Sequence, residues 1–163
     1  MRILHATLLF VGATLSVPVA ADEASERAIE KDRKLIAGDW LIAKLVVNGN
    51  ESKAEDIGKL MVTNEPNGKW ILKSDGQVVA QGTSTIDPSA TPKTINFTTV
   101  GGDQDGKRYQ GIYQLGRQQR KMCFAPSDKD RPKSFSSAEG SDNILVVFQA
   151  MPKKVEIGAP LPD

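Results

Sequence analysis

The feature that most constrains this chain is a regular alternation of short β-prone runs with turn residues. Turn chemistry such as Asn48-Gly49 and Asp75-Gly76 separates the runs, and no helical period lies between them. The runs are Trp40–Val47, Lys59–Thr63, Lys69–Lys73, Gln77–Ile86, Thr94–Val100, Arg108–Leu115, Arg120–Ala125 and Asn143–Ala150. This spacing predicts an all-β, antiparallel meander. We favour a barrel of about eight strands over a sandwich, because closure in sequence order leaves no exposed edge.

Three further segments complete the predicted organisation. Residues 22–37 are charged and carry a narrow apolar stripe at helical spacing, which predicts a short amphipathic N-terminal helix packed against the barrel domain, residues 38–151. The longest break in the pattern, residues 126–142, predicts a surface loop or a lid over one barrel end. The Pro-rich tail, residues 152–163, predicts an extended segment.

The first 21 residues have the layout of a cleavable secretory signal. Arg2 provides a short basic region, a mostly apolar stretch follows, and small residues precede Asp22. We expect cleavage after about Ala21 and an exported protein, periplasmic or extracellular. No later apolar run approaches the roughly 20 residues that a membrane-spanning helix needs, so we expect no membrane span.

Histidine and charge counts exclude several classes of function. The only histidine, His5, lies in the predicted signal segment, so the mature chain has no histidine for a nucleophile pair, a general base or a metal site. The chain has 21 Lys and Arg residues against 20 Asp and Glu, and Arg2 is one of the basic residues. A formally neutral mature chain lacks the basic surface of a nucleic-acid binder. We therefore expect no enzyme, no catalytic or metal-binding residue and no cofactor.

The first β-prone run opens with Gly38-Asp39-Trp40. A Gly-x-Trp at this position resembles the opening of lipocalin-type barrels, in which the Trp plugs the closed end and a late Arg lies across its ring. The resemblance implies a structural role for Gly38 and Trp40, because a large aromatic ring fills the barrel taper and a stacked guanidinium adds cation–π attraction.

A series of motifs in fixed order resembles the planctomycete-type uncharacterised domain family. The motifs are Leu35–Trp40, Ile86-Asp87-Pro88, Pro92–Phe97, Gly111–Leu115, Lys121–Ala125 and Arg131–Phe135. This resemblance covers roughly residues 35–150 and implies an exported, lipocalin-like β-barrel with no established activity. The positions that carry it, all expected to be structural, are Gly38, Trp40, Asp87, Pro88, Gly111, Tyr113, Cys123, Arg131, Pro132 and Phe135.

The last run and Met151 after it contain no basic residue, so an arginine for Trp40 must come from elsewhere in the chain. We hypothesise that Arg131, fixed by Pro132, stacks on Trp40 or Tyr113 or pairs with a carboxylate at the barrel rim, while Phe135 anchors the loop. The alternative is an ordinary solvated loop arginine.

Two other residues have a structural and a functional interpretation. Gly111 makes room for a neighbouring aromatic side chain or marks a bend, with backbone approach by a ligand as the alternative. Cys123, the only cysteine, is expected to be buried rather than reactive.

The leading functional hypothesis is a monomeric, non-enzymatic barrel that binds a small apolar or amphipathic ligand. The alternative is a protein-interaction module that acts through residues 22–36 or the barrel rim, since exported bacterial barrels with a similar Gly-x-Trp include protease inhibitors. A hydrolase that uses only carboxylates is a third class, and it requires two acids converging in one cleft.

Overall fold

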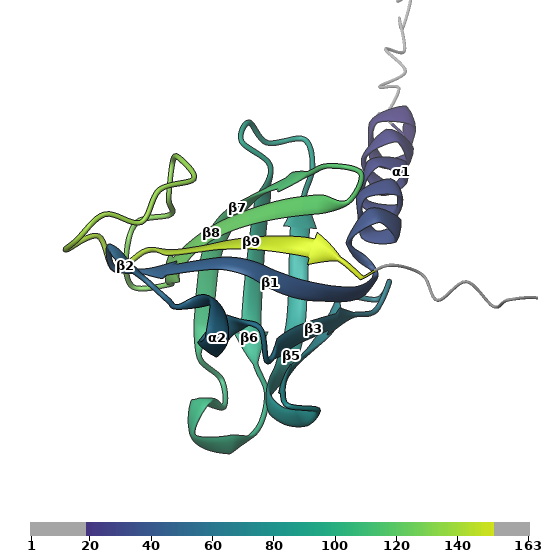
Figure 1. Cartoon of the computed structure of the whole chain (residues 1–163). Coiled ribbons are helices and arrows are strands. Elements are labelled where there is room, and N and C mark those ends of the chain that lie inside the picture. Colours follow the sequence, from purple (N-terminus) through teal and green to yellow (C-terminus); the bar gives the residue numbers. More distant parts are fainter. Residues whose placement is uncertain (1–18, 152–163) are drawn as a thin grey trace, which may run out of the picture.

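A computed structural model describes residues 19–151 and has a closed antiparallel barrel of eight strands preceded by a helix (Figure 1). The barrel strands are β1 (Gly38–Val47), β3 (Leu60–Asn64), β4 (Lys69–Ser74), β5 (Gln77–Asp87), β6 (Thr94–Thr99), β7 (Arg108–Leu115), β8 (Gln119–Pro126) and β9 (Ile144–Ala150). From β3 to β9 each strand pairs with the next. β1 pairs with both β3 and β9 and so closes the barrel. The predicted eight-stranded meander barrel is confirmed.

Three short elements were not predicted from the sequence. The two-residue strand β2 (Asn50–Glu51) forms a hairpin with the end of β1, and the single-turn helix α2 (Ala54–Ile57) follows it. A 3-10 turn, η1 (Gly102–Gln104), lies between β6 and β7. Each is too short to produce a recognisable hydrophobic period.

A bulge in β1 keeps a lysine out of the barrel interior. The register against β9 shifts between Ile42 and Lys44. Strict alternation would direct Lys44 to the same face as Ile42. With the bulge, Leu45 takes the next inner position instead, and Lys44 lies outside with its Nζ 2.9 Å from a carboxylate oxygen of Glu51.

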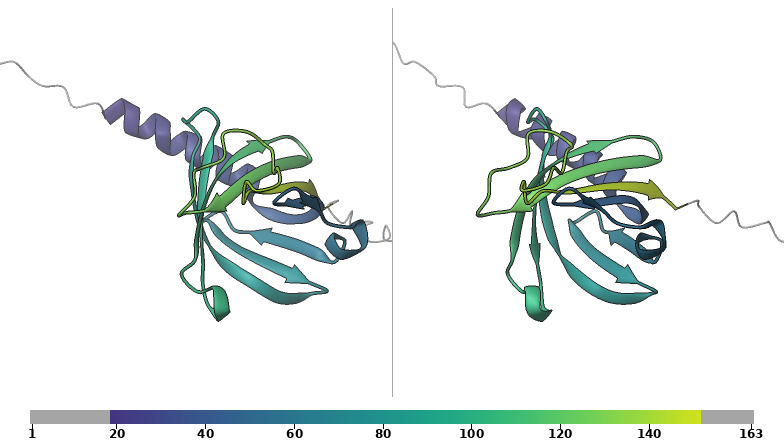
Figure 2. Two further views of the ribbon diagram at one scale, coloured as in Figure 1. Left: turned by 90° about the vertical axis from the view of Figure 1, so that its left-hand side faces the viewer. Right: turned by 60° about the vertical axis from the view of Figure 1, so that its left-hand side comes forward.

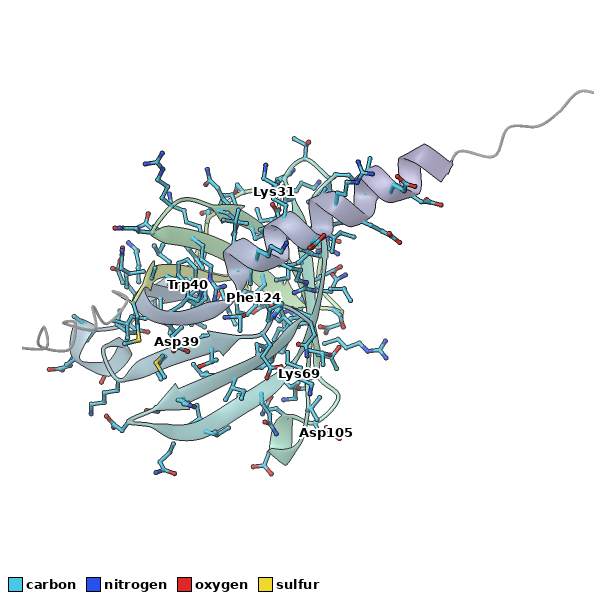
Figure 3. All side chains as sticks on the ribbon, turned by 90° about the vertical axis from the view of Figure 1, so that its right-hand side faces the viewer. Lys31, Asp39, Trp40, Lys69, Asp105 and Phe124 are labelled. Atoms are coloured by element: carbon cyan, nitrogen blue, oxygen red, sulfur yellow. The ribbon has the colours of Figure 1, made fainter. Side chains whose placement is uncertain are left out.

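The helix α1 (Val19–Ile36) covers one end of the barrel with its last turns. Ile36 is buried, and its carbonyl accepts a hydrogen bond of 2.9 Å from Trp40 Nε1; Figure 3 shows Trp40 beside this end of the helix. The buried Asp32 accepts hydrogen bonds of 2.7 Å from the Tyr113 hydroxyl and from Lys93 Nζ. Gly38, at φ 111°, makes the sharp change of direction from helix to strand.

The long connection between β8 and β9 packs on the outer face of the barrel. Cys123 Sγ donates to the carbonyl of Ser136 at 3.3 Å, and Gln110 Nε2 donates to the carbonyl of Lys129. Strand alternation places Gln110 and Cys123 on the face opposite the interior. This part of the connection therefore forms a surface loop, one of the two predicted alternatives.

The predicted signal segment and tail fall largely outside the described residues. Residues 1–18 and 152–163 lie outside them, and residues 19–21 form the start of α1. Within residues 19–151, no helix has the length and apolar character to cross a membrane.

Candidate ligand-binding cavity

The barrel interior contains a cavity of about 320 Å³. All eight barrel strands contribute side chains to its wall, and most of them are apolar. Trp70, Phe97, Tyr109 and Phe124 form one side, with the Phe97 and Phe124 rings edge to face at a centroid distance of 4.7 Å. Figure 3 shows Phe124 inside the barrel. A concave, mainly apolar wall of this size is typical of small-molecule sites.

The cavity is closed at the α1 end and reaches the surface at the other. Near α1 the lining residues Arg120 and Phe148 are 1% and 5% exposed. At the opposite end, which faces the viewer in the left panel of Figure 2, the lining residue Gln104 is exposed. A ligand would therefore enter at the end opposite α1.

Arg120 is the central polar residue of the closed end. Its guanidinium lies between two aromatic rings, with Cζ 4.5 Å from the Trp40 ring centroid and 4.4 Å from that of Phe148. One terminal nitrogen donates to the carbonyl of Ile36 at 3.0 Å, which is the same carbonyl that accepts from Trp40. Arg120 thus joins β8 to the end of α1 and also lines the cavity.

Two buried N–H groups of the cavity wall have no hydrogen-bond partner among the described residues. They are Arg120 Nε and Asn64 Nδ2. Asn64 pairs with Gly38 in the β1–β3 ladder, two residue pairs away from Trp40 and Val62, so both groups lie at the α1 end. Among residues 19–151, no acidic side chain lines the cavity. Burial lowers the pKa of Arg120 to about 9, and the side chain remains a cation at neutral pH.

The structure corrects the hypothesis for Arg131. The cation on Trp40 is Arg120, whereas the Arg131 guanidinium donates to the carbonyls of Ile95 and Gly111, at 3.1 and 2.6 Å, and to Asn96 Oδ1 at 2.7 Å. Arg131 therefore ties the outer loop to β6 and β7 by hydrogen bonds to backbone carbonyls and an amide, and its stacking on Trp40 or Tyr113 and its pairing with a carboxylate are wrong. Beside it, Pro132 is buried and Phe135 half-buried.

The other predicted motif residues do not converge on one site. Tyr113 belongs to the core, and burial together with the hydrogen bond to Asp32 raises its pKa well above the usual range, so it is a hydrogen-bond donor rather than a nucleophile. Asp87 is exposed, precedes the half-buried Pro88, and accepts hydrogen bonds from the amide and hydroxyl of Ser89 in a turn. Cys123 is fully buried, and burial raises the pKa of its thiol.

Gly111 stands at a close approach of two strands. A Cβ at this position would lie 2.5 Å from the carbonyl oxygen of Cys123 and 2.6 Å from Phe124 Cβ. The absence of a side chain at Gly111 therefore makes room for the strand that carries Phe124, which is the structural one of the two interpretations given above.

Sequence reasoning overlooked Arg120 and Asn64. The signal was nevertheless present for Arg120, because Arg120, Met122 and Phe124 alternate along one strand and must share a face. A charged residue in phase with two large apolar ones is a candidate for an inward-facing cation. No comparable pattern marks Asn64, which ends its strand next to a turn.

No metal site is evident among residues 19–151, where no three His, Cys, Asp or Glu side chains lie close enough to hold an ion. Comparison of the chain with protein-family models, curated proteins and solved structures finds no match. The resemblance to the planctomycete-type family stays a prediction.

Proposed function

We propose that this protein is a non-enzymatic binding protein that holds one small, mainly apolar ligand inside its barrel. The observation that carries the proposal is the cavity of about 320 Å³, walled by side chains from all eight strands and open at one end. Eight-stranded barrels are just wide enough either to be filled by their own side chains or to hold one small ligand. A cavity of this size supports the second case.

Chemistry within the barrel supports binding rather than catalysis. Among residues 19–151, the lining contains no carboxylate, histidine or cysteine, so the wall offers none of these groups as a base to activate its hydroxyl side chains, such as that of Ser84. The polar cluster of Asp32, Lys93 and Tyr113 uses its hydrogen bonds to hold α1 against the barrel.

The test is binding of a small neutral apolar fluorophore, 1-naphthylamine, to the purified protein. We expect saturable binding with one site per chain. Ala80→Phe places a ring in the cavity and should abolish binding. Val79→Phe adds the same ring to a neighbouring side chain that is 55% exposed, and should leave binding unchanged. Absence of saturable binding to the parent protein, or equal loss in both variants, would contradict the proposal.

A protein-interaction role for the N-terminal segment is the second candidate. Residues 21–27 are all exposed, and α1 projects beyond the barrel in Figure 1. Deletion of the whole segment 22–37 would also remove Asp32 and Ile36, whose hydrogen bonds fix α1 to the end of the barrel. Deletion of residues 22–27 spares both. Loss of a partner captured by the parent protein, with fluorophore binding intact, would favour this candidate.

Export is part of the proposal, and its support is the sequence pattern of residues 1–21. Expression of the full chain in a Gram-negative host should yield a periplasmic product whose N-terminal sequence begins at about Asp22. A cytoplasmic product that retains Met1 would contradict it.

A further inference from the structure

We propose that the ligand carries an anionic head group, a carboxylate, which binds Arg120 Nε and Asn64 Nδ2 at the closed end of the cavity while an apolar tail points toward the open end. This inference rests on the proposed ligand-binding function and specifies the class of ligand. The observation behind it is that the two buried N–H groups without a protein acceptor both belong to the same cavity wall and lie at the same end of it.

Arg120 Nε and Asn64 Nδ2 are buried donors without an acceptor among the described residues, which is energetically unfavourable. A buried N–H without an acceptor destabilises a protein by roughly 1–3 kcal/mol, and by more when the group is charged. The aromatic rings of Trp40 and Phe148 stabilise the cation through its faces. They accept no hydrogen bond at the guanidinium edge, so Nε has no acceptor among the described residues. Because Nε and Asn64 Nδ2 are both enclosed, the head group reaches them through a small movement of the side chains.

The positive charge of Arg120 favours an anionic acceptor in the ligand over a neutral one. Within the part of the chain that the structure describes, Arg120 is the only charged side chain in the cavity wall, and no carboxylate lies there to neutralise it. In a low-dielectric environment an unbalanced cation attracts an anion more strongly than a neutral acceptor and repels a second cation. A carboxylate offers two oxygens, which matches the presence of two donors from different strands.

The size and shape of the cavity limit the length and bulk of the ligand's apolar tail. At about 30 Å³ for a water-sized group, the volume of about 320 Å³ holds roughly ten non-hydrogen groups. The wall beyond Arg120 and Asn64 is mainly apolar and ends at the half-buried Leu60 and Ile144. A single unbranched chain of medium length therefore fits, and a two-chain lipid does not.

The test compares three ligands that share one tail and differ in charge: decanoate, 1-decanol and decyltrimethylammonium. Each displaces bound 1-naphthylamine at pH 7.5. We expect decanoate to bind about tenfold more tightly than decanol, which corresponds to the lower limit for a hydrogen bond to a charged group, and decyltrimethylammonium to bind least tightly. Equal or tighter binding of decanol would overturn the head-group inference.

Substitution of Asn64 or Arg120 tests whether their N–H groups cause the preference for decanoate over decanol. Asn64→Leu and Arg120→Gln should each reduce the tenfold preference for decanoate over decanol to about threefold or less. Arg117→Gln, a substitution of an exposed arginine near the same end of β8, is the matched control and should keep the full preference. A full preference in both Asn64→Leu and Arg120→Gln would overturn the assignment.

A direct readout keeps the inference testable if Arg120→Gln does not fold. In the parent protein labelled with ¹⁵N at arginine, the Arg120 Nε–H resonance should shift on addition of decanoate and not on addition of decanol. An unshifted resonance at saturating decanoate would overturn the head-group contact. If the fluorophore binds and the three ligands displace it equally, only the head-group inference fails; if neither the fluorophore nor any of the three ligands binds, the proposed function fails as well.

Discussion

Arg120 and Trp40 hold opposite parts of the chain together, because the guanidinium on β8 lies 4.5 Å from the ring centroid on β1 and both side chains donate to the carbonyl of Ile36. One carbonyl at the end of α1 therefore links the helix to the first and the seventh strand of the barrel. Phe148 on β9, which lies between these strands in the sheet, covers the other face of the same guanidinium.

Arg120→Lys should destabilise the protein by about 1–3 kcal/mol. Lysine keeps the positive charge but lacks the planar group that stacks on two rings, and each cation–π contact contributes roughly 0.5–2 kcal/mol. The measurement is urea-induced unfolding followed by tryptophan fluorescence. Arg117→Lys, at an exposed position near the same end of the strand, should change stability by less than about 0.5 kcal/mol. Equal unfolding midpoints for the two variants would contradict a stabilising role for the stacking of Arg120 on Trp40 and Phe148.

Tyr113→Phe should cost about 1–3 kcal/mol at pH 7, because the buried Asp32 loses a hydroxyl donor. The pKa of Tyr113 is raised in the folded protein, whereas in the unfolded chain it is about 10. Below pH 10 both states hold the proton, so the contribution of Tyr113 is complete. As the pH rises above 10 the unfolded state loses its proton first, and the contribution decreases.

The difference in unfolding free energy between the parent protein and Tyr113→Phe should therefore be smaller at pH 10.5 than at pH 7. Tyr109→Phe, which removes a hydroxyl from the same strand that does not contact Asp32, is the matched control and should cost less at pH 7. If the stability lost in Tyr113→Phe grew between pH 7 and pH 10.5, the predicted decrease of the Tyr113 contribution with pH would be contradicted.

The strands could be predicted from the sequence because each depends on local pattern. Runs such as Arg108–Leu115 combine β-prone residues with flanking turns, and closure follows from the number and order of the runs. The bulge in β1 could not be predicted, although Lys44 gives a reason for it after the fact. The alternation places a lysine inside, and the chain avoids this with one extra residue.

The candidate site was harder to predict because its geometry is non-local. Which arginine meets Trp40 depends on the register of β8 and β9, and only the closed barrel brings Arg120 to that ring. The sequence pointed to Arg131 because it precedes a proline in a loop, a position that favours an anchor but does not specify its target. The cavity depends on the packing of all eight strands, which no local pattern encodes.

Gly111→Ala should destabilise the barrel by about 1–3 kcal/mol, the usual cost of forcing an extra methyl group into a packed region. The new Cβ would lie 2.5 Å from a backbone oxygen of Cys123, which cannot move without disturbing the β7–β8 ladder. Gly58→Ala is the matched control, because its φ of −62° suits alanine and its nearest neighbour would be 3.1 Å away. The check is thermal unfolding, and equal midpoints for the two variants would contradict the close approach.

Arg131→Gln should expose Cys123 to reagents about tenfold faster without unfolding the barrel. Cys123 is fully buried under the loop that Arg131 holds through three hydrogen bonds to β6 and β7. Hydrogen bonds to a charged group contribute roughly 1.5–3 kcal/mol, and 1.4 kcal/mol corresponds to a tenfold larger open population. The rate is measured with an aromatic disulfide reagent that reports thiol modification.

Lys133→Gln changes an exposed residue of the same loop and should leave the rate within about twofold of the parent protein. Urea unfolding of each variant separates local opening from global destabilisation, since a loop that opens alone leaves the midpoint nearly unchanged. If Arg131→Gln reacted no faster than Lys133→Gln, the loop would be held by its other contacts, such as the hydrogen bond from Gln110 to Lys129. In that case the role of Arg131 would be limited to the two backbone carbonyls that it satisfies.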